Sequence, residues 1–182
     1  MTLFPLHLDQ AVTRHRGAVL VGPVTLALTA QRGTTVVLGP NGAGKTSLLR
    51  LMQGAARVAE GSVHWACPMA EARRHQAFVF QHPVMLRRSV LDNLMYPLRL
   101  RGVSRAVAQT RARNWAARVG LSDMLERPAP VLSGGERQKL ALARALITDP
   151  QVVFLDEPCA ALDGRAMREI EEILMRAKAD GT

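Results

Sequence analysis

The sequence predicts an α/β fold with a mostly parallel sheet core, an antiparallel β part at the N-terminus and an inserted α-helical subdomain. Three observations support this fold class. A glycine-rich loop at residues 39–46 joins an apolar run to a helical pattern. Short apolar runs alternate with helical patterns along most of the chain, which is typical of parallel sheets covered by helices. A helical, arginine-rich stretch at about residues 83–130 interrupts this alternation.

The glycine-rich loop carries the strongest chemical signal. It follows Thr34–Leu38, which predicts a buried strand, and leads into Thr46–Met52, which predicts the first turns of a helix. Glycines let the backbone curl around an anion, and the N–H groups of the loop and helix start point inward. We expect Lys45 to reach the β- and γ-phosphates of a nucleoside triphosphate and the Thr46 hydroxyl to hold Mg²⁺. The predicted phosphate-binding residues are Gly39, Pro40, Asn41, Gly42, Ala43, Gly44, Lys45, Thr46 and Ser47.

Composition restricts the class of protein. A chain of 182 residues with 48% hydrophobic residues suits one domain with a substantial core. No stretch approaches 18 apolar residues, so no transmembrane helix is predicted, and the N-terminus lacks the pattern of a signal peptide. Cys67 and Cys159 have no metal or redox spacing and are expected to be free thiols. Together these features predict a cytoplasmic protein.

Positive charge is concentrated in one part of the chain. The net charge is +9, and ten arginines lie between Arg73 and Arg118 against Asp92 alone. Such a segment suits a solvated helical face, or contact with nucleic acid, an anionic membrane surface or an acidic partner. Few aromatic residues lie among these arginines to stack on bases, so nucleic acid is not expected as a partner.

The strands and turns follow from apolar runs and turn residues. Val19–Val21 and Val24–Leu28 are expected to flank a turn at Gly22-Pro23, and Gln31–Gly33 is expected to form another turn. Further strands are predicted at 62–66, 77–80 and 152–155, the last as a central strand covered on both faces. We expect one domain over residues 1–182, with a core at 1–82 and 131–182 and the helical subdomain at about 83–130.

The helices follow from capping residues and breakers. Ser89 is expected to cap a helix that Pro97 stops, and Ser104 to cap a helix that ends near Val119. A short helical turn is expected at 122–125 and a longer helix at 137–147. The last helix, at about 164–179, is predicted to bury an apolar face formed by Met167, Ile170, Ile173, Leu174 and Ala177.

An acidic pair directly follows the apolar run at 152–155. Asp156 and Glu157 are therefore expected at the carboxyl end of a central strand, where ligands bind in open α/β sheets. One carboxylate there can hold the Mg²⁺ that bridges the β- and γ-phosphates, and a second can orient an attacking water. The pair forms the second component of the predicted triphosphate site.

The remaining motifs resemble those of a known family. Leu132–Glu136 matches the signature motif of the ATP-binding cassette (ABC) transporter nucleotide-binding subunits, Gln81 matches the Q-loop and Ala161–Asp163 matches the D-loop. With the phosphate loop, these motifs cover nearly the whole chain in the family's order. The resemblance implies a P-loop NTPase core with the ABC ATPase fold, an ATP- and Mg²⁺-dependent ATPase activity and a role in transport.

The resemblance also implies roles for individual residues. Glu157, Gln81 and Lys45 would be catalytic, and Thr46, Gln81 and Asp156 would hold the metal. Two copies would pair head to tail around two ATP molecules. The residues expected to face the partner's nucleotide or the partner subunit are Ser133, Gly134, Gly135 and Asp163.

The helical subdomain resembles the part of the family that docks on membrane-spanning subunits. Residues 89–101 and 126–130 are similar to those of importers. The resemblance implies a subunit at the inner face of the cell membrane, partnered by permease subunits and a solute-binding protein, and powering import of a small solute such as an inorganic oxyanion. The rival interpretations are an ABC ATPase acting on nucleic acid or ribosomes, and an ATP-binding switch with impaired hydrolysis.

The sequence departs from the family pattern at two places. One concerns the residue that contacts adenine, and the other is the reason for the hypothesis of a switch with impaired hydrolysis. Where the family places an aromatic residue that stacks on adenine, this chain offers only His15. The family continues with a strand and an H-loop histidine, whereas this sequence ends at Thr182 and has no histidine after His82. The resemblance therefore implies a fragment or a truncated subunit in which the C-terminal end of the domain is missing.

Overall fold

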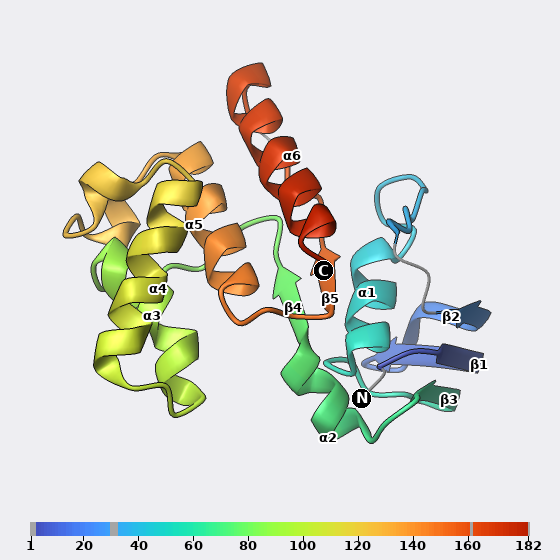
Figure 1. Cartoon of the computed structure of the whole chain (residues 1–182). Helices are drawn as coiled ribbons and strands as arrows, with labels where there is room; N and C mark the ends of the chain where they lie inside the picture. The colour runs from blue at the N-terminus through green and yellow to red at the C-terminus, as the bar shows by residue number, and fades with distance from the viewer. Residues whose placement is uncertain (1–2, 30–32, 161, 182) are drawn as a thin grey trace. The chain divides into compact units, whose positions relative to one another are not determined.

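A computed structural model describes residues 3–29, 33–160 and 162–181 of the chain (Figure 1). The chain divides into two compact units, Met1–Gln76 and Ala77–Thr182, and each unit is described by itself. Among the helices of the described residues, none combines the length and the apolar character needed to cross a membrane.

The first unit contains a three-stranded antiparallel sheet in the order β2-β1-β3. Its strands are β1 (Leu6–His15), β2 (Ala18–Leu28) and β3 (Glu60–Trp65). The central strand β1 buries Leu6, Leu8 and Ala11. The antiparallel N-terminal part predicted from the sequence is confirmed, as is the strand expected near 62–66.

The turn predicted at Gly22-Pro23 is wrong, because β2 runs through these residues without a break. The pairing with β1 shifts register here, with Ala11 opposite Val24 and Thr13 opposite Val21. Gly22 has φ +115°, and a Cβ at this position would lie 2.4 Å from the Ala11 carbonyl oxygen. Gly22 therefore lies in a β-bulge where the backbones of β1 and β2 approach closely, and the chain does not reverse direction there. The other predicted turn, Gln31–Gly33, lies mostly outside the described residues.

The buried strand predicted at Thr34–Leu38 is also wrong. The segment has no regular structure, and Val36 and Leu38 are 69% and 88% exposed. A parallel strand needs neighbours that are distant in sequence, whereas the sheet of this unit is antiparallel and consists of β1, β2 and β3. The predicted helix is confirmed as α1 (Lys45–Gln53), which buries Leu51 and Met52. A short helix, α2 (Met69–Ala72), and a 3₁₀ turn at Arg73–His75 complete the unit.

In the described residues of the second unit, four α-helices surround one hydrophobic core: α3 (Val90–Leu100), α4 (Arg105–Arg118), α5 (Gly134–Leu146) and α6 (Gly164–Ala179). Its two strands, β4 (Gln76–Val79) and β5 (Val152–Leu155), pair with each other. Short 3₁₀ turns occur at Ser122–Met124 and Ala129–Val131. The predicted strands, the helix after Ser104 and the helix after Ser133 are confirmed within two residues at most ends. Ser104 occupies the N-cap position of α4, but its side chain makes no capping hydrogen bond, so the predicted cap is wrong. Of β5 only Phe154 is buried, so the expected cover on both faces is not seen.

The end predicted for the first helix of this unit is wrong. Ser89 caps α3 as expected, since its hydroxyl accepts a hydrogen bond from the Asp92 N–H (3.1 Å). The helix then continues through Pro97 to Leu100. A proline inside a helix removes one backbone hydrogen bond, but Leu98 in the same turn is almost completely buried. Packing of the last turn into the core outweighs the local penalty.

A buried polar network fastens the segment before α3 to α5. The Asn93 side chain is fully buried; it accepts from the Leu86 N–H (3.0 Å) and donates to the Ser89 carbonyl (2.9 Å). From α5, the Arg144 guanidinium donates to the Val84 carbonyl (2.8 Å) and to Asn93 Oδ1 (3.3 Å). Burial lowers the pKa of Arg144 from its usual value. The loop at 84–89 is thus tied to the helix that follows residue 133.

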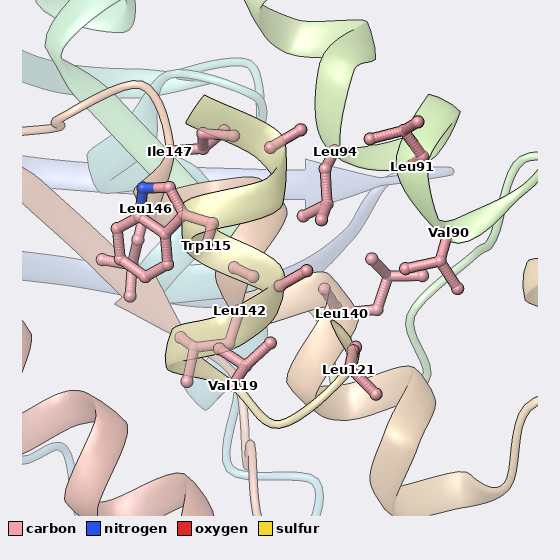
Figure 2. Close-up of a cluster of buried hydrophobic side chains, with 14 of the residues drawn as sticks. Val90, Leu91, Leu94, Trp115, Val119, Leu121, Leu140, Leu142, Leu146 and Ile147 are labelled. Carbon is pink, nitrogen blue, oxygen red and sulfur yellow. The ribbon is translucent and has the colours of Figure 1, made fainter. Parts of the chain in front are cut away.

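Figure 2 shows the core of the second unit, where side chains of α3, α4 and α5 meet. From α6, Ile170, Ile173 and Ala177 are buried as predicted, whereas Met167 is 39% exposed, so the predicted apolar face is wrong at that position. The core residues labelled in Figure 2 are Val90, Leu91, Leu94, Trp115, Val119, Leu121, Leu140, Leu142, Leu146 and Ile147.

Two leucines of α3 provide a matched test of this core. Leu94 is fully buried, whereas Leu100 is 69% exposed. We expect Leu94→Ala to lower the free energy of unfolding by about 2–5 kcal/mol, because it removes buried methyl groups and leaves a cavity. Leu100→Ala, with the same change on the same helix, should alter it by less than about 0.5 kcal/mol. Urea unfolding followed by circular dichroism measures both, and equal effects would contradict the core assignment.

Candidate functional site

The phosphate loop of the first unit forms a turn that leads directly into α1. Gly42 has φ +83° and Gly44, the N-cap residue of the helix, has φ +88°. A Cβ at Gly44 would lie 2.6 Å from the Leu20 carbonyl oxygen, so this position accepts only glycine without displacement. The Ala43 N–H donates to the Pro40 carbonyl (3.2 Å) and closes the turn. Gly39, Pro40 and Asn41 are exposed on this turn.

The lysine of this loop folds back over it. Lys45 Nζ donates to the carbonyl oxygens of Gly39 (3.0 Å) and Pro40 (3.2 Å). The Leu48 N–H donates to the Gly44 carbonyl (2.8 Å), so the N–H groups of Lys45, Thr46 and Ser47 precede the helical ladder. A cation and a helix start at one loop form an environment that favours an anion.

In the second unit, two residues 76 positions apart meet beyond the ends of β4 and β5. Gln81 Nε2 donates to Glu157 Oε2 at 3.0 Å. The Asp156 N–H donates to the Val79 carbonyl (2.9 Å), and the Asp156 side chain is buried. Glu157 has φ +46°, an uncommon conformation for a residue other than glycine, and its side chain is exposed. The fold therefore brings Gln81 to the acidic pair.

The segment at 133–136 forms a capping box at the start of α5. The Ser133 hydroxyl accepts from the Glu136 N–H (3.4 Å), and Glu136 Oε2 accepts from the Ser133 N–H (2.7 Å). The backbone hydrogen bond from Ser133 is the largest cause that lowers the pKa of Glu136, followed by the bond with the Ser133 side chain. Gly134 is exposed and Gly135 is half-buried, so backbone at this helix start is accessible.

A second helix N-terminus lies beside the first. Asp163 caps α6, because its Oδ1 accepts from the N–H groups of Arg165 (3.0 Å) and Ala166 (2.8 Å). A hollow of about 500 Å³ is lined by both helix starts. It thus joins two motifs that lie about 30 residues apart: Ser133, Gly134 and Gly135 with Leu162 and Asp163. Ala161 of the predicted D-loop lies outside the described residues.

His15 stands apart from these two motifs in the sequence and lies in the first unit. It ends β1 and is exposed, next to the turn at Arg16 and Gly17 that leads into β2. Its expected contact with adenine stays a prediction.

The donor chemistry fits a magnesium ion. Within the described residues, no group of three or more His, Cys, Asp or Glu side chains is arranged to hold a metal. Magnesium is usually bound through one or two carboxylates together with substrate phosphates and water. In the second unit, the Asp156 carboxylate and the Gln81 amide are oxygen donors of that kind, so the residues present there suit the ion when a triphosphate accompanies it.

The structure adds residues that the sequence analysis missed. Lys139, Arg165 and Glu169 also line the hollow between the two helix starts. A signal for Lys139 was present, since it follows Gly135 by four residues and therefore lies on the same face of α5. Nothing in the sequence pairs Lys139 with Glu169, because that contact depends on how α5 and α6 pack.

Comparison with known proteins identifies the family. A family model described as ABC transporter matches residues 24–160. The chain is 39% identical over 151 residues to the tungstate uptake system ATP-binding protein TupC of Peptoclostridium acidaminophilum, covering 82% of this chain and 71% of that protein. It is 36% identical over 175 residues to the taurine import ATP-binding protein TauB of Pseudomonas savastanoi pv. phaseolicola, covering 94% and 67%.

A third relative belongs to a different kind of transport system. The lipoprotein-releasing system ATP-binding protein LolD of Chromohalobacter salexigens is 43% identical over 150 residues, covering 76% of this chain and 63% of that protein. The chain therefore spans about two thirds of the length of these relatives.

Solved structures share the fold. The cbiO1 protein from Clostridium perfringens, described as part of the ABC transporter complex cbiONQ, has a TM-score of 0.81 at 23% identity, covering 97% of this chain and 74% of that one. A bacterial Atm1-family ABC exporter with ATP bound has a TM-score of 0.79 at 23% identity, covering 96% and 32%. These likenesses confirm the ABC ATPase fold predicted from the sequence. The chain belongs to the ABC transporter family and is one of its ATP-binding subunits, which are ATPases.

Proposed function

We propose that this chain hydrolyses ATP to power import of a small solute through a membrane transporter. The observation that carries this proposal is the hydrogen bond between Gln81 and Glu157 beside the buried Asp156. It sets an exposed carboxylate, suited to polarise a water molecule, next to an amide and a second carboxylate. A structural turn would not require this combination of groups.

Binding of ATP is assigned to the phosphate loop. Lys45 exchanges its two loop carbonyl contacts for phosphate oxygens, and the backbone of residues 39–47 surrounds the phosphates. Thr46 is proposed as a magnesium ligand from the first unit, and Asp156 and Gln81 as ligands from the second. When bound, the magnesium ion neutralises charge that develops on the phosphates. His15 is proposed as the adenine contact.

Hydrolysis is assigned to Glu157, with Gln81 and Lys45 as the other catalytic groups. Glu157 accepts a proton from the attacking water while Gln81 orients its carboxylate. Two copies pair head to tail in this proposal, so that Ser133, Gly134 and Gly135 of one copy contact the nucleotide of the other. The start of α5 suits this role, because its N–H groups favour an anion. Asp163 contacts the partner subunit.

The arginine-rich part of the second unit is proposed to dock on permease subunits at the inner face of the membrane. Some of its arginines are used within the unit: Arg111 pairs with Asp149 (2.5 Å), and Arg118 pairs with Asp180 and lies over Trp115. The exposed arginines supply charge for acidic loops or anionic headgroups; they include Arg87, Arg88, Arg99, Arg105 and Arg113. A solute-binding protein completes the proposed importer, and no nucleic acid is expected.

The proposed solute is an inorganic oxyanion. This choice is supported by the 39% identity to the tungstate uptake protein and by the importer-like segments at 89–101 and 126–130. The lipoprotein-releasing relative, at 43% identity, supplies the specific alternative. A test in cells must therefore separate uptake from lipoprotein release.

Lys45→Ala tests the binding site. We expect affinity for ATP to fall roughly 10- to 100-fold, because a hydrogen-bonding cation at the phosphates is lost. Arg57→Ala, which removes an exposed cation of the same unit, should leave affinity unchanged. Isothermal titration calorimetry with ATP and Mg²⁺ measures both variants. Equal affinity of Lys45→Ala and the unmodified chain would refute the assignment.

Glu157→Gln tests catalysis separately from binding. We expect kcat to fall about 10²- to 10⁴-fold while ATP binding persists, because the amide cannot accept the proton of water. Glu126→Gln neutralises an exposed carboxylate elsewhere in the unit and should retain full turnover. Steady-state phosphate release measures kcat. Undiminished release by Glu157→Gln would favour another base.

The cellular role is tested by placing Glu157→Gln in the native gene. The initial rate of tungstate uptake should fall at least about tenfold, since transport depends on turnover. Metal content by mass spectrometry measures uptake, and fractionation of outer and inner membranes measures lipoprotein release. Unchanged uptake together with retained lipoprotein in the inner membrane would support the alternative system.

A further inference from the structure

An ion-pair network links α5 to α6 beside the two helix starts. Lys139 Nζ lies 2.9 Å from Glu169 Oε2, and Arg165 Nε lies 3.0 Å from Glu169 Oε1. Both oxygens of the one carboxylate are therefore engaged, one by each helix. The hydrogen bond from Lys139 is the largest cause that lowers the pKa of Glu169.

The two pairs differ in their surroundings. The Lys139 side chain is 15% exposed and Glu169 is 35% exposed, whereas Arg165 is 87% exposed. A solvated pair such as Arg165–Glu169 contributes little, because water screens it. Removing Glu169 would leave the Lys139 ammonium mostly buried, beside two helix starts that also favour negative charge. Of the two ion pairs, the pair between Lys139 of α5 and Glu169 of α6 therefore contributes more to holding the helices together.

Close packing reinforces the same junction. An added Cβ at Gly135 would lie 3.1 Å from the Ala166 Cβ, so α6 is packed against the first turn of α5. Asp163 caps α6 through the N–H groups of Arg165 and Ala166. The hollow of about 500 Å³ at this junction is lined by the cap residues and by Lys139 and Glu169.

We propose that Glu169 is a positioning residue for ATP hydrolysis. Through its ion pair with Lys139, it holds the start of α6, where Asp163 lies, in a fixed position relative to the start of α5. The proposal rests on the function proposed above. In a head-to-tail pair, the starts of both helices must meet the partner copy at the same time. Fixing them to each other in advance removes part of the ordering cost of association.

Loss of this ion pair should therefore weaken association of the two copies and spare the phosphate loop. The loop belongs to the first unit, whereas Lys139 and Glu169 belong to the second. ATP binding by the single chain should stay unchanged. The protein concentration that gives half-maximal ATPase activity should rise, because association limits turnover at low concentration. A general loss of folding would instead reduce ATP binding and activity together.

The experiment uses the full chain with Glu169→Gln, Lys139→Met and the double variant. For each single variant we expect the half-maximal protein concentration to rise about tenfold, with ATP affinity within about twofold of the unmodified chain. The double variant should be no worse than either single variant, since both remove one contact. Lys139→Arg, which keeps the charge, should restore most of the association.

Glu172→Gln is the matched control. Glu172 lies on α6 and pairs with Arg176 (3.5 Å), but both side chains are exposed and neither lines the hollow at the two helix starts. This variant should match the unmodified chain in every assay. Sedimentation velocity with ATP and Mg²⁺ gives the association constant without requiring turnover.

Three results would overturn the inference. The first is association of Glu169→Gln equal to that of Glu172→Gln. The second is an additive loss in the double variant, and the third is a drop in ATP affinity that parallels the drop in association. Absence of turnover in the unmodified chain would instead refute the proposed function, and sedimentation would still report on Glu169 in that case.

Discussion

The burial of α5 in the core of the second unit is the constraint on which the other features of that unit depend. Leu140, Leu142 and Leu146 are almost completely buried, and α3, α4 and α6 all pack on this helix. Burial of apolar side chains fixes the position of the helix axis, and this position in turn determines where the polar side chains of the helix lie. The capping box at Ser133, the ion pair at Lys139 and the guanidinium of Arg144 are positioned by this burial of the helix.

Charge in this molecule is arranged around helix and loop ends. The phosphate loop combines a lysine with the start of α1, and the hollow of the second unit combines two helix starts with Lys139 and Glu169. Helix starts favour negative charge, so a carboxylate such as Asp163 or Glu136 stabilises each start in the absence of a ligand.

Much of the fold could be predicted because local signals and tertiary packing agree. The helix after Ser133 has a capping box that matches its burial, and the strands near 77–80 and 152–155 and the antiparallel N-terminal part have the expected apolar runs. The resemblance assigned Gln81 and Asp156 to one metal ion, but it did not predict the hydrogen bond between Gln81 and Glu157. The roles of these residues in binding and catalysis stay predictions.

The errors have a common physical origin, since each depends on contacts between distant residues. Gly22-Pro23 forms a bulge against Ala11, Pro97 is held inside α3 by the burial of Leu98, and Thr34–Leu38 is apolar but unpaired within its unit. Met167 has helical spacing but lies beyond the edge of the buried stripe of α6. The pairing of Lys139 with Glu169 could not be predicted. Periodicity shows which face of a helix is buried, but it does not show which other helix packs against that face.

The contacts of Arg144 connect α5 to the loop after Gln81. Arg144 fastens one end of the helix to the segment at 84–89, only a few residues after Gln81, while Ser133 caps the other end. Ten residues separate Gly134 from Arg144, which corresponds to about 15 Å along the helix axis. Because buried side chains hold the axis of α5, the loop after Gln81 and the start of α5 belong to one packed body across this distance.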